Sequence, residues 1–251
     1  MESQHYEQNF LKSVIVRADF AAPMIGMTDV WPTAVTKAVL RQFPIEEEHA
    51  TVQMSTQSMV AGVLSQPELK NETEVHYYSL DRNKHLGLGR GFLFVEISKY
   101  EGFSGLTQLF EPVVRELFGA TLDLAIKRLG LRYINVVTAR GEDPLQWSGF
   151  INPRLSSMLG FVKDSNRITR AMGNMEFNFD GIGLRLQYGV FNPDYPAVVK
   201  RKEFILDIDA SSPGLTSYEQ FMEQLVTLHG HVTTVFELAI GERLRKAMMA
   251  P

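Results

Sequence analysis

The side chains with the clearest potential for chemistry are the acidic and basic residues of the expected strands. Asp207 and Asp209 stand two residues apart, and alternate residues of a strand point to the same face, so both carboxylates lie on one face. Carboxylates at this spacing suit Mg²⁺ or Mn²⁺, but no third acidic ligand follows nearby in the sequence. We therefore predict no metal site.

Alternation along the other strands adds basic and polar side chains to the same face. We predict that the ligand-binding or partner-binding residues are Arg17, Asp19, Arg132, Arg185, Gln187, Asp207 and Asp209. Two interpretations remain open. The face is either a solvated surface with cross-strand ion pairs, or a binding groove or partner surface in which guanidinium groups clamp an anionic group.

Other motifs have ordinary structural explanations. Gly87, Gly89 and Gly91 lack the spacing of a dinucleotide-binding fingerprint and the lysine of a P-loop, so we expect a bulge or bend in a long strand. His229 and His231 stand two apart on an expected helix and point in different directions, which favours helix-surface histidines over a shared metal. A catalytic triad assembled from distant positions stays open, and the catalytic residues are unknown.

Composition narrows the class of protein. The 251 residues carry a formal net charge of −4, which argues against a nucleic-acid binder that relies on counterion release. Cysteine is absent, which excludes disulfides, thiolate nucleophiles and cysteine metal sites. The N-terminus lacks the regions of a signal peptide, and no apolar run reaches the length of a membrane helix. We expect a cytoplasmic protein that uses no cofactor and does not contact a membrane.

Hydrophobic periodicity predicts the elements that position these residues. Alternating or apolar runs indicate strands at 14–20, 51–59, 75–80, 86–97, 131–137, 167–179, 182–191 and 203–210. Apolar residues spaced by three and four indicate helices at 31–43, 106–129 and 218–248. Ser217 and Gln220 form a capping box before the last helix, and Asp180-Gly181 is typical of a tight hairpin turn.

The chain also carries signs of an internal repeat. Phe94–Ser98 is followed by Asp123–Ile126, and Ile205–Asp209 is followed by the similar segment Glu237–Ile240. We predict an α+β fold, internally duplicated, with a curved and mainly antiparallel sheet and two long helices packed on one face, like a saddle or a helix-grip. Residues 1–251 would form a single domain built of two pseudo-repeats, at about 14–129 and 131–248.

Four segments carry a resemblance to a known family. They are the strand Leu131–Asn135 after a long helix, the strands Leu184–Tyr188 and Leu206–Asp209, and the stretch from Val235-Phe236-Glu237 to Leu244-Arg245. Together they resemble a sporadically distributed family of bacterial proteins of about this length that has no established function. Phe10–Ser13 departs from the proline-led motif that members usually have before the first strand. The resemblance implies a cytoplasmic bacterial protein from accessory genes, such as defence or toxin-neutralising ones.

Three classes of function are compatible with these observations. The first, which we favour, is a non-enzymatic protein-interaction module that binds a protein partner or another copy of itself. The second is a sensor of a small anionic ligand, held between sheet and helices or clamped by Arg17, Arg132 and Arg185. The third is a nucleic-acid-binding saddle or an unrecognised hydrolase. A cavity favours the second class over the first, and a continuous positive stripe favours the third.

Overall fold

The computed structural model of the chain describes residues 6, 8–23, 31–54, 59–60, 63–64, 69–121, 124–141, 143–161 and 167–249, and between 50 and 73 it describes the backbone alone. The elements of the first half are β1 (Leu11–Phe20), α1 (Thr33–Gln42), β2 (Ile45–Met54), β3 (Met59–Val60), β4 (Val63–Leu64), β5 (Leu69–Tyr78), β6 (Lys84–Gly89), β7 (Phe92–Ile97) and α2 (Phe103–Ala120).

In chain order, the strands of the second half begin and end with a very long strand, and a long helix follows them. Its elements are β8 (Ile126–Thr138), α3 (Pro153–Ser156), the 3₁₀ helix η1 (Ser157–Gly160), β9 (Ala171–Phe179), β10 (Ile182–Val190), β11 (Glu203–Leu215), α4 (Tyr218–Ala239) and α5 (Glu242–Met249). Among the described residues, no helix is long and apolar enough to cross a membrane.

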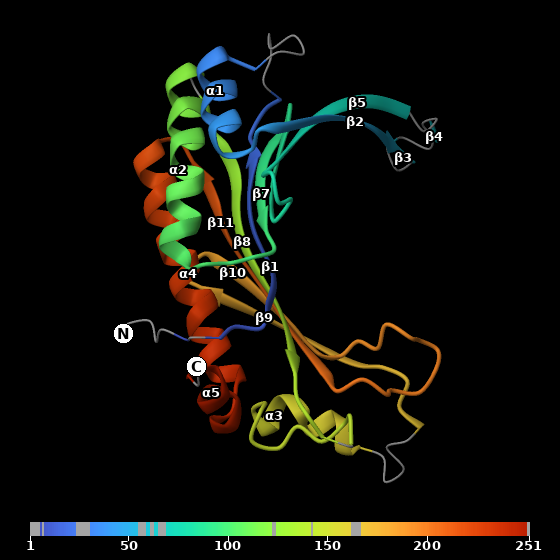
Figure 1. The fold of residues 1–251 in the computed structure, drawn as a ribbon. Helices are drawn as coiled ribbons and strands as arrows, with labels where there is room; N and C mark the ends of the chain where they lie inside the picture. Colours follow the sequence, from blue (N-terminus) through green and yellow to red (C-terminus); the bar gives the residue numbers. More distant parts are fainter. Residues whose placement is uncertain are drawn as a thin grey trace.

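The described strands form one large antiparallel sheet that does not close into a barrel. Nine strands pair in the order β2-β5-β6-β7-β1-β8-β11-β10-β9, while β3 and β4 pair only with each other. Figure 1 shows a strongly curved sheet with α1, α2 and α4 along one side and the β2–β5 hairpin projecting from the other. The predicted α+β class with a large, mainly antiparallel sheet is therefore confirmed.

Burial in the central strand follows the alternation of its sequence. Val14, Val16 and Ala18 of β1 are buried in the hydrophobic core, while Arg17 is exposed and Asp19 is partly exposed on the other face. Because successive side chains of a strand point to opposite faces, the sheet has one face toward the helices and one away from them. We call the second one the uncovered face.

The helix predicted at 106–129 is wrong in its last part. The helix α2 ends at Ala120, and β8 begins at Ile126, so Arg128 and Leu129 belong to a strand. The pairing of β1 with β8 shifts register between Asp19 and Phe20, which marks a β-bulge opposite this stretch. A bulge interrupts strict alternation, and apolar residues at 126 and 129 then imitate the spacing of a helix.

The segment 123–126 therefore does not share the helical structure of 237–240, the segment that the predicted repeat matches with it. Residue 123 lies outside the described residues, and Ile126 opens a strand, whereas Leu238 and Ala239 end α4. The predicted final helix is also interrupted after Ala239. There Gly241 donates from its backbone nitrogen to the Phe150 carbonyl at 2.7 Å, and a Cβ at Gly241 would meet the Gly149 carbonyl oxygen at 2.3 Å. This close approach needs a glycine, and α5 starts beyond it.

The glycines predicted to bend one long strand instead belong to a tight hairpin of β6 and β7. A Cβ at Gly87 would lie 2.2 Å from the ring of Phe94, and one at Gly89 would lie 2.6 Å from the ring of Phe92. Both aromatic rings therefore lie across β6 on the uncovered face. The turn at Asp180-Gly181 is as predicted, since both residues have positive φ, at 52° and 95°.

The two halves place their strands on either side of the β1–β8 pair. Counting outward from the centre, β1 is followed by β7, β6, β5 and β2, and β8 is followed by β11, β10 and β9, so the first half has one strand more. The halves join where β1 pairs with β8, with Val14 opposite Tyr133 and Ile15 opposite Arg132. The helix layer contains more than the two long helices predicted, because α1 packs beside α2 and α5 follows α4.

Replacing Phe221 tests the helix layer. The ring of Phe221 is buried between α2 and α4, with its centroid 5.8 Å from that of Phe110, so Phe221→Ala should lower the free energy of unfolding by about 3 to 5 kcal/mol. The ring of Phe236, farther along α4, is only partly buried. Phe236→Ala should therefore cost about half as much. Urea unfolding of both variants measures the difference, and equal losses would contradict this packing.

Candidate functional site

The structure brings all seven predicted site residues to the uncovered face. They come from four neighbouring strands, β1, β8, β11 and β10, which are adjacent in the sheet. In the strand register Arg185 lies opposite Asp209, Gln187 lies opposite Asp207, and Asp209 also lies opposite Arg132. The period-two assignment of these side chains is therefore correct.

Five charged side chains of alternating sign form what we call the ion-pair ladder. Its members are Arg17, Asp19, Arg128, Asp209 and Arg185. Arg17 Nε lies 2.7 Å from Asp19 Oδ1, and Arg128 Nη1 lies 3.8 Å from Asp19 Oδ2. Arg128 and Arg185 each lie 3.4 Å from one oxygen of Asp209. The ladder thus crosses all four strands with its charges paired.

A second contact joins β8 to β11 more tightly. Arg132 donates from Nε and Nη2 to the two oxygens of Asp207 at 2.8 and 2.6 Å. The Asp207 side chain is only 9% exposed, against 36% for Arg132. These hydrogen bonds raise the pKa of Arg132. A bidentate pair to a shielded carboxylate fixes the guanidinium and leaves it little freedom to bind another anion.

Arg128 is the ladder member that the sequence did not predict, because its segment was assigned to a helix. Its side chain lies over Gly130, where a Cβ would stand 2.7 Å from Arg128 Nη1. Arg17, Arg128 and Arg132 surround a hollow of about 280 Å³, whose wall also includes Phe94 and Glu96. Every guanidinium around this hollow already contacts a carboxylate.

A second site lies on the other side of the sheet, under α4. We call it the helix-sheet cavity. Its volume is about 390 Å³, and it is lined by Tyr6, Asn9, Leu11, Tyr100, Glu101, Gly102, Phe103, Tyr133, Asn135, His229, Val232, Thr233, Phe236, Glu237 and Met248. The lining comes from the N-terminal segment, β1, β8, α4, α5 and the start of α2. A cavity of this size is within the range of small-molecule sites.

Three titratable side chains in this cavity form a hydrogen-bonded chain. The hydroxyl oxygens of Tyr100 and Tyr133 lie 2.7 Å apart, and the Tyr133 hydroxyl lies 3.0 Å from His229 Nδ1. Burial raises the pKa of Tyr100 to about 12 and raises that of Tyr133 well above its ordinary value. Burial also lowers the pKa of His229 to about 4. All three groups are therefore uncharged near neutral pH.

His229 is held from a second side by an aromatic ring. Its imidazole stacks on Phe103 with centroids 4.0 Å apart and planes 2° from parallel. His231 instead stacks on Phe179, at 4.6 Å, so the two histidines do point to different flanks of α4 as predicted. Neither is a plain surface residue, because both are half-buried against aromatic rings.

The wall of the cavity formed by α4 and the N-terminal segment is closed by polar contacts. Tyr6 donates its hydroxyl hydrogen to Glu237 at 2.5 Å, and Arg245 lies 3.0 Å from the same carboxylate group. Asn135, almost fully buried, donates from its amide nitrogen to the Leu206 carbonyl at 3.2 Å. The polar groups of the wall are thus mainly neutral or already paired.

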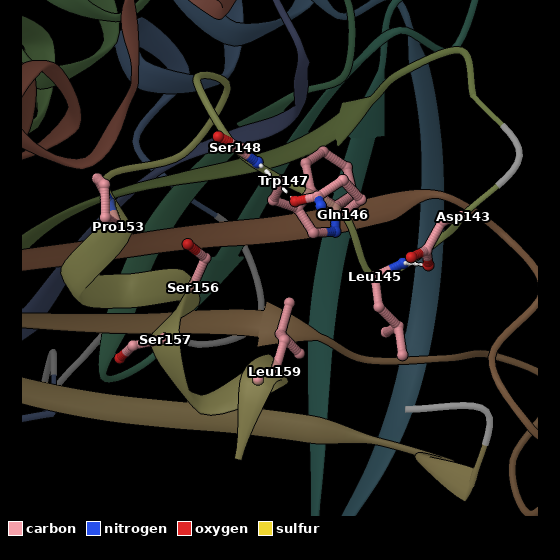
Figure 2. A pocket seen from close by; sticks show the side chains of 10 residues that line it. Asp143, Leu145, Gln146, Trp147, Ser148, Pro153, Ser156, Ser157 and Leu159 are labelled. Carbon is pink, nitrogen blue, oxygen red and sulfur yellow. Dashed lines mark hydrogen bonds between the residues drawn. The ribbon is translucent and has the colours of Figure 1, made fainter. Parts of the chain in front are cut away.

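A larger hollow, of about 500 Å³, lies beside α3 and is drawn in Figure 2. Ser148, Ser156 and Ser157 line it, together with Asp143 and Trp147. The Ser157 hydroxyl donates to the Arg154 carbonyl at 3.1 Å, and an Asp143 carboxylate oxygen accepts from the Leu145 backbone nitrogen at 2.8 Å. No histidine is among the described lining residues, so these hydroxyls have no adjacent imidazole base.

Comparisons with known proteins give no functional assignment. No family model matches the sequence, and no curated protein is significantly similar to it. The resemblance to a sporadically distributed bacterial family therefore stays a prediction. Function must be inferred from the geometry of the sites.

Substitution of the face arginines should separate the tight pair from the ladder. Arg132→Ala leaves the shielded Asp207 carboxylate without its bidentate partner, so we expect a loss of about 2 kcal/mol of unfolding free energy. Arg185 is 43% exposed and makes one long contact, so Arg185→Ala should cost less than about 1 kcal/mol. Urea unfolding at low salt gives both values. Equal losses of unfolding free energy would show that the bidentate pair stabilises the fold no more than the single contact of Arg185.

The neutral state of His229 predicts how stability depends on pH. Its folded-state pKa of about 4 lies below the ordinary value of 6.5, so between these values the unfolded chain binds a proton that the folded chain does not. Stability is then lost as pH falls from 6.5 toward 4, by roughly 2 kcal/mol for a half-buried ring, and is constant for this group above 6.5.

The measurement is urea unfolding at several pH values, for the parent and for His229→Gln. The pKa of His85 is lowered to about 4 as well, so it contributes a slope of the same sign. His229→Gln should therefore flatten the profile in part and His85→Gln should flatten the rest. If the free energy of unfolding depends on pH in the same way for His229→Gln and for the parent, the His229 imidazole is not neutral and buried as described.

Proposed function

We propose that the protein binds a small uncharged aromatic molecule in the helix-sheet cavity. The observation that carries this proposal is the chain of Tyr100, Tyr133 and His229, which lines a cavity of about 390 Å³ between sheet and helix. Ligand sites are typically concave and mostly apolar, with a few convergent polar groups. This cavity has that composition. For this reason we favour ligand binding over protein interaction.

The polar groups of the cavity indicate the chemistry of the ligand. His229 and the two tyrosines are uncharged near neutral pH, and the described lining contains no lysine or arginine. His229 Nδ1 is used by Tyr133, so Nε2 offers a donor or an acceptor according to the tautomer. The ring of Phe103 stacked on His229 and the partly buried Phe236 supply aromatic surface. These features suit a planar heterocycle with one hydrogen-bonding atom.

An anionic ligand, the class predicted from the sequence, has weaker support. Arg17, Arg132 and Arg185 each contact a carboxylate already, at 2.7, 2.6 and 3.4 Å. An anion would have to displace one of these carboxylates and leave it unpaired. The arginines are therefore better explained as members of cross-strand ion pairs than as an empty anion clamp.

A matched pair of variants on α4 tests the proposal. Thr233 lines the cavity, while its neighbour Thr234 is exposed and donates to the Gly230 carbonyl. Thr233→Phe should fill the cavity and Thr234→Phe should not. The probe is a library of planar nitrogen heterocycles, screened by thermal shift and confirmed by calorimetry on the full chain.

We expect ligands that raise the melting temperature of the parent and of Thr234→Phe but not of Thr233→Phe. Tyr133→Phe, which removes the central hydroxyl of the chain, should weaken binding about tenfold because a buried polar partner is lost. Ligands that bind Thr233→Phe as well as they bind the parent would overturn the cavity assignment. Unchanged melting of each variant without ligand is the control for folding.

A second candidate is self-association through the uncovered face. Its supporting observation is the alternation of sign along the ion-pair ladder, because a face with paired charges of both signs can complement a second copy of itself about a two-fold axis. Because the charges of the ion-pair ladder alternate in sign, the ladder is not the continuous positive stripe that nucleic-acid binding requires. The oligomeric state in solution decides this candidate. A cytoplasmic location and an accessory role such as defence stay proposals.

Internal duplication is part of the proposal. The support is that β1 and β8 are each followed outward by antiparallel strands, four after β1 and three after β8, and that in each half the strand next to the centre leads into a long helix. A duplication would place a pseudo-two-fold axis near the pair Val14 and Tyr133. Ile15 and Arg132 would then lie near the axis on the uncovered face, and the helix-sheet cavity would lie near it on the other face.

A further inference from the structure

Three histidines form a row on the uncovered face. They come from three adjacent strands: His49 from β2, His76 from β5 and His85 from β6. The rings of His49 and His76 stack with centroids 4.2 Å apart, and those of His76 and His85 with centroids 4.9 Å apart. Nothing in the proposed ligand site uses this row.

The ring nitrogens of His76 and His85 lie near each other on one side and near carboxylates on the other. His76 Nδ1 and His85 Nε2 face each other at 2.7 Å. The outer nitrogens face carboxylates, with His76 Nε2 3.2 Å from Glu74 and His85 Nδ1 3.9 Å from Glu96. Glu96 is itself held by the Ser13 hydroxyl, which donates to it at 2.7 Å. Each ring thus has one nitrogen directed at a carboxylate and one at the other ring.

This arrangement determines where the protons lie. Two neutral imidazole rings carry two N–H hydrogens on their four nitrogens. At 2.7 Å the inner nitrogens have room for one hydrogen between them, because two N–H groups would collide. The other hydrogen then lies on His76 Nε2, 3.2 Å from Glu74, which can accept it. Burial and the neighbouring His76 lower the pKa of His85 to about 4, which opposes a third hydrogen on the pair.

We propose that His76 and His85 bind a divalent transition-metal ion in place of this shared proton. Imidazole nitrogens are ligands for Cu²⁺, Zn²⁺ and Ni²⁺, whereas Mg²⁺ and Ca²⁺ prefer oxygen. Metal-binding histidines usually donate their other N–H to a carboxylate or carbonyl, and here Glu74 and Glu96 stand at those positions. The hydrogen between the rings then moves to the outer nitrogen of His85, on the side of Glu96, so that both inner lone pairs can reach the ion.

The site needs only a small movement to accept the ion. Nitrogens at about 2.05 Å from a tetrahedral ion lie about 3.3 Å apart, so the rings must separate by less than about 1 Å from their present contact. No group of three or more imidazole or carboxylate side chains in the described residues has metal-binding geometry as it stands. Water therefore completes the coordination, and the ion is exchangeable.

The surroundings predict that acid opposes binding. Among the described side chains, the charged and titratable groups that face the pair are Glu47, His49, Glu74, Tyr78, Arg82 and Glu96. Protons compete with the ion for the lone pairs of imidazole nitrogens. Affinity should therefore fall as the pH is lowered.

The experiment is calorimetric titration of the untagged full chain with Zn²⁺ and with Cu²⁺. We expect one ion per chain. His76→Phe and His85→Phe keep an aromatic ring in the stack but remove the nitrogens, and each should weaken binding at least tenfold. Glu74→Gln should weaken it by about tenfold or more through the outer N–H. His231→Phe, on α4, is the control and should bind like the parent.

The same variants can also contradict the proposal. Equal melting temperatures without metal show that the phenylalanine variants are folded. If the folded His76→Phe and His85→Phe variants bind as tightly as the parent, the ion is held elsewhere and the site assignment is wrong. No saturable binding by the parent overturns the proposal as well. Either result leaves the row as a structural stack at the root of the hairpin.

Discussion

The antiparallel pairing of β1 with β8 is the contact on which the rest of the structure depends. It joins the two halves of the chain, and the register of its central pairs decides which side chains face the helices. A shift of one residue would exchange the two faces of every strand that follows. Burial of Val14, Val16 and Leu131 opposes such a shift, because each would be moved from the core into water.

One step along β8 separates two different sites. Arg132 points to the uncovered face and binds Asp207, while Tyr133 points under α4 and binds Tyr100 and His229. The same alternation therefore produces a charged surface and an uncharged cavity from neighbouring residues. The backbone between them is rigidly paired on both sides, so the two sites are held in a constant relative position.

Features that depend on alternation within one strand could be predicted from the sequence, and features that depend on pairing could not. The seven face residues and the turn at Asp180-Gly181 belong to the first kind. Arg128 was missed because a bulge disturbs the alternation around it. Tyr100, Tyr133 and His229 are separated by 33 and 96 residues and meet only through the fold, and no local pattern marks them as partners. The histidine row depends likewise on the registers of three strands.

The molecule treats ionisable groups differently on its two faces, and this difference limits what each face can bind. On the uncovered face the charges persist because each has an opposite charge within about 4 Å, which offsets partial loss of water. Under α4, Tyr133 and His229 have no counter-charge and remain neutral, as the lowered pKa of His229 and the raised pKa of Tyr133 indicate. The described lining contains no lysine or arginine, so an anion entering the cavity would find no partner for its charge. An uncharged ligand loses less on leaving water, so the cavity discriminates by charge before it discriminates by shape.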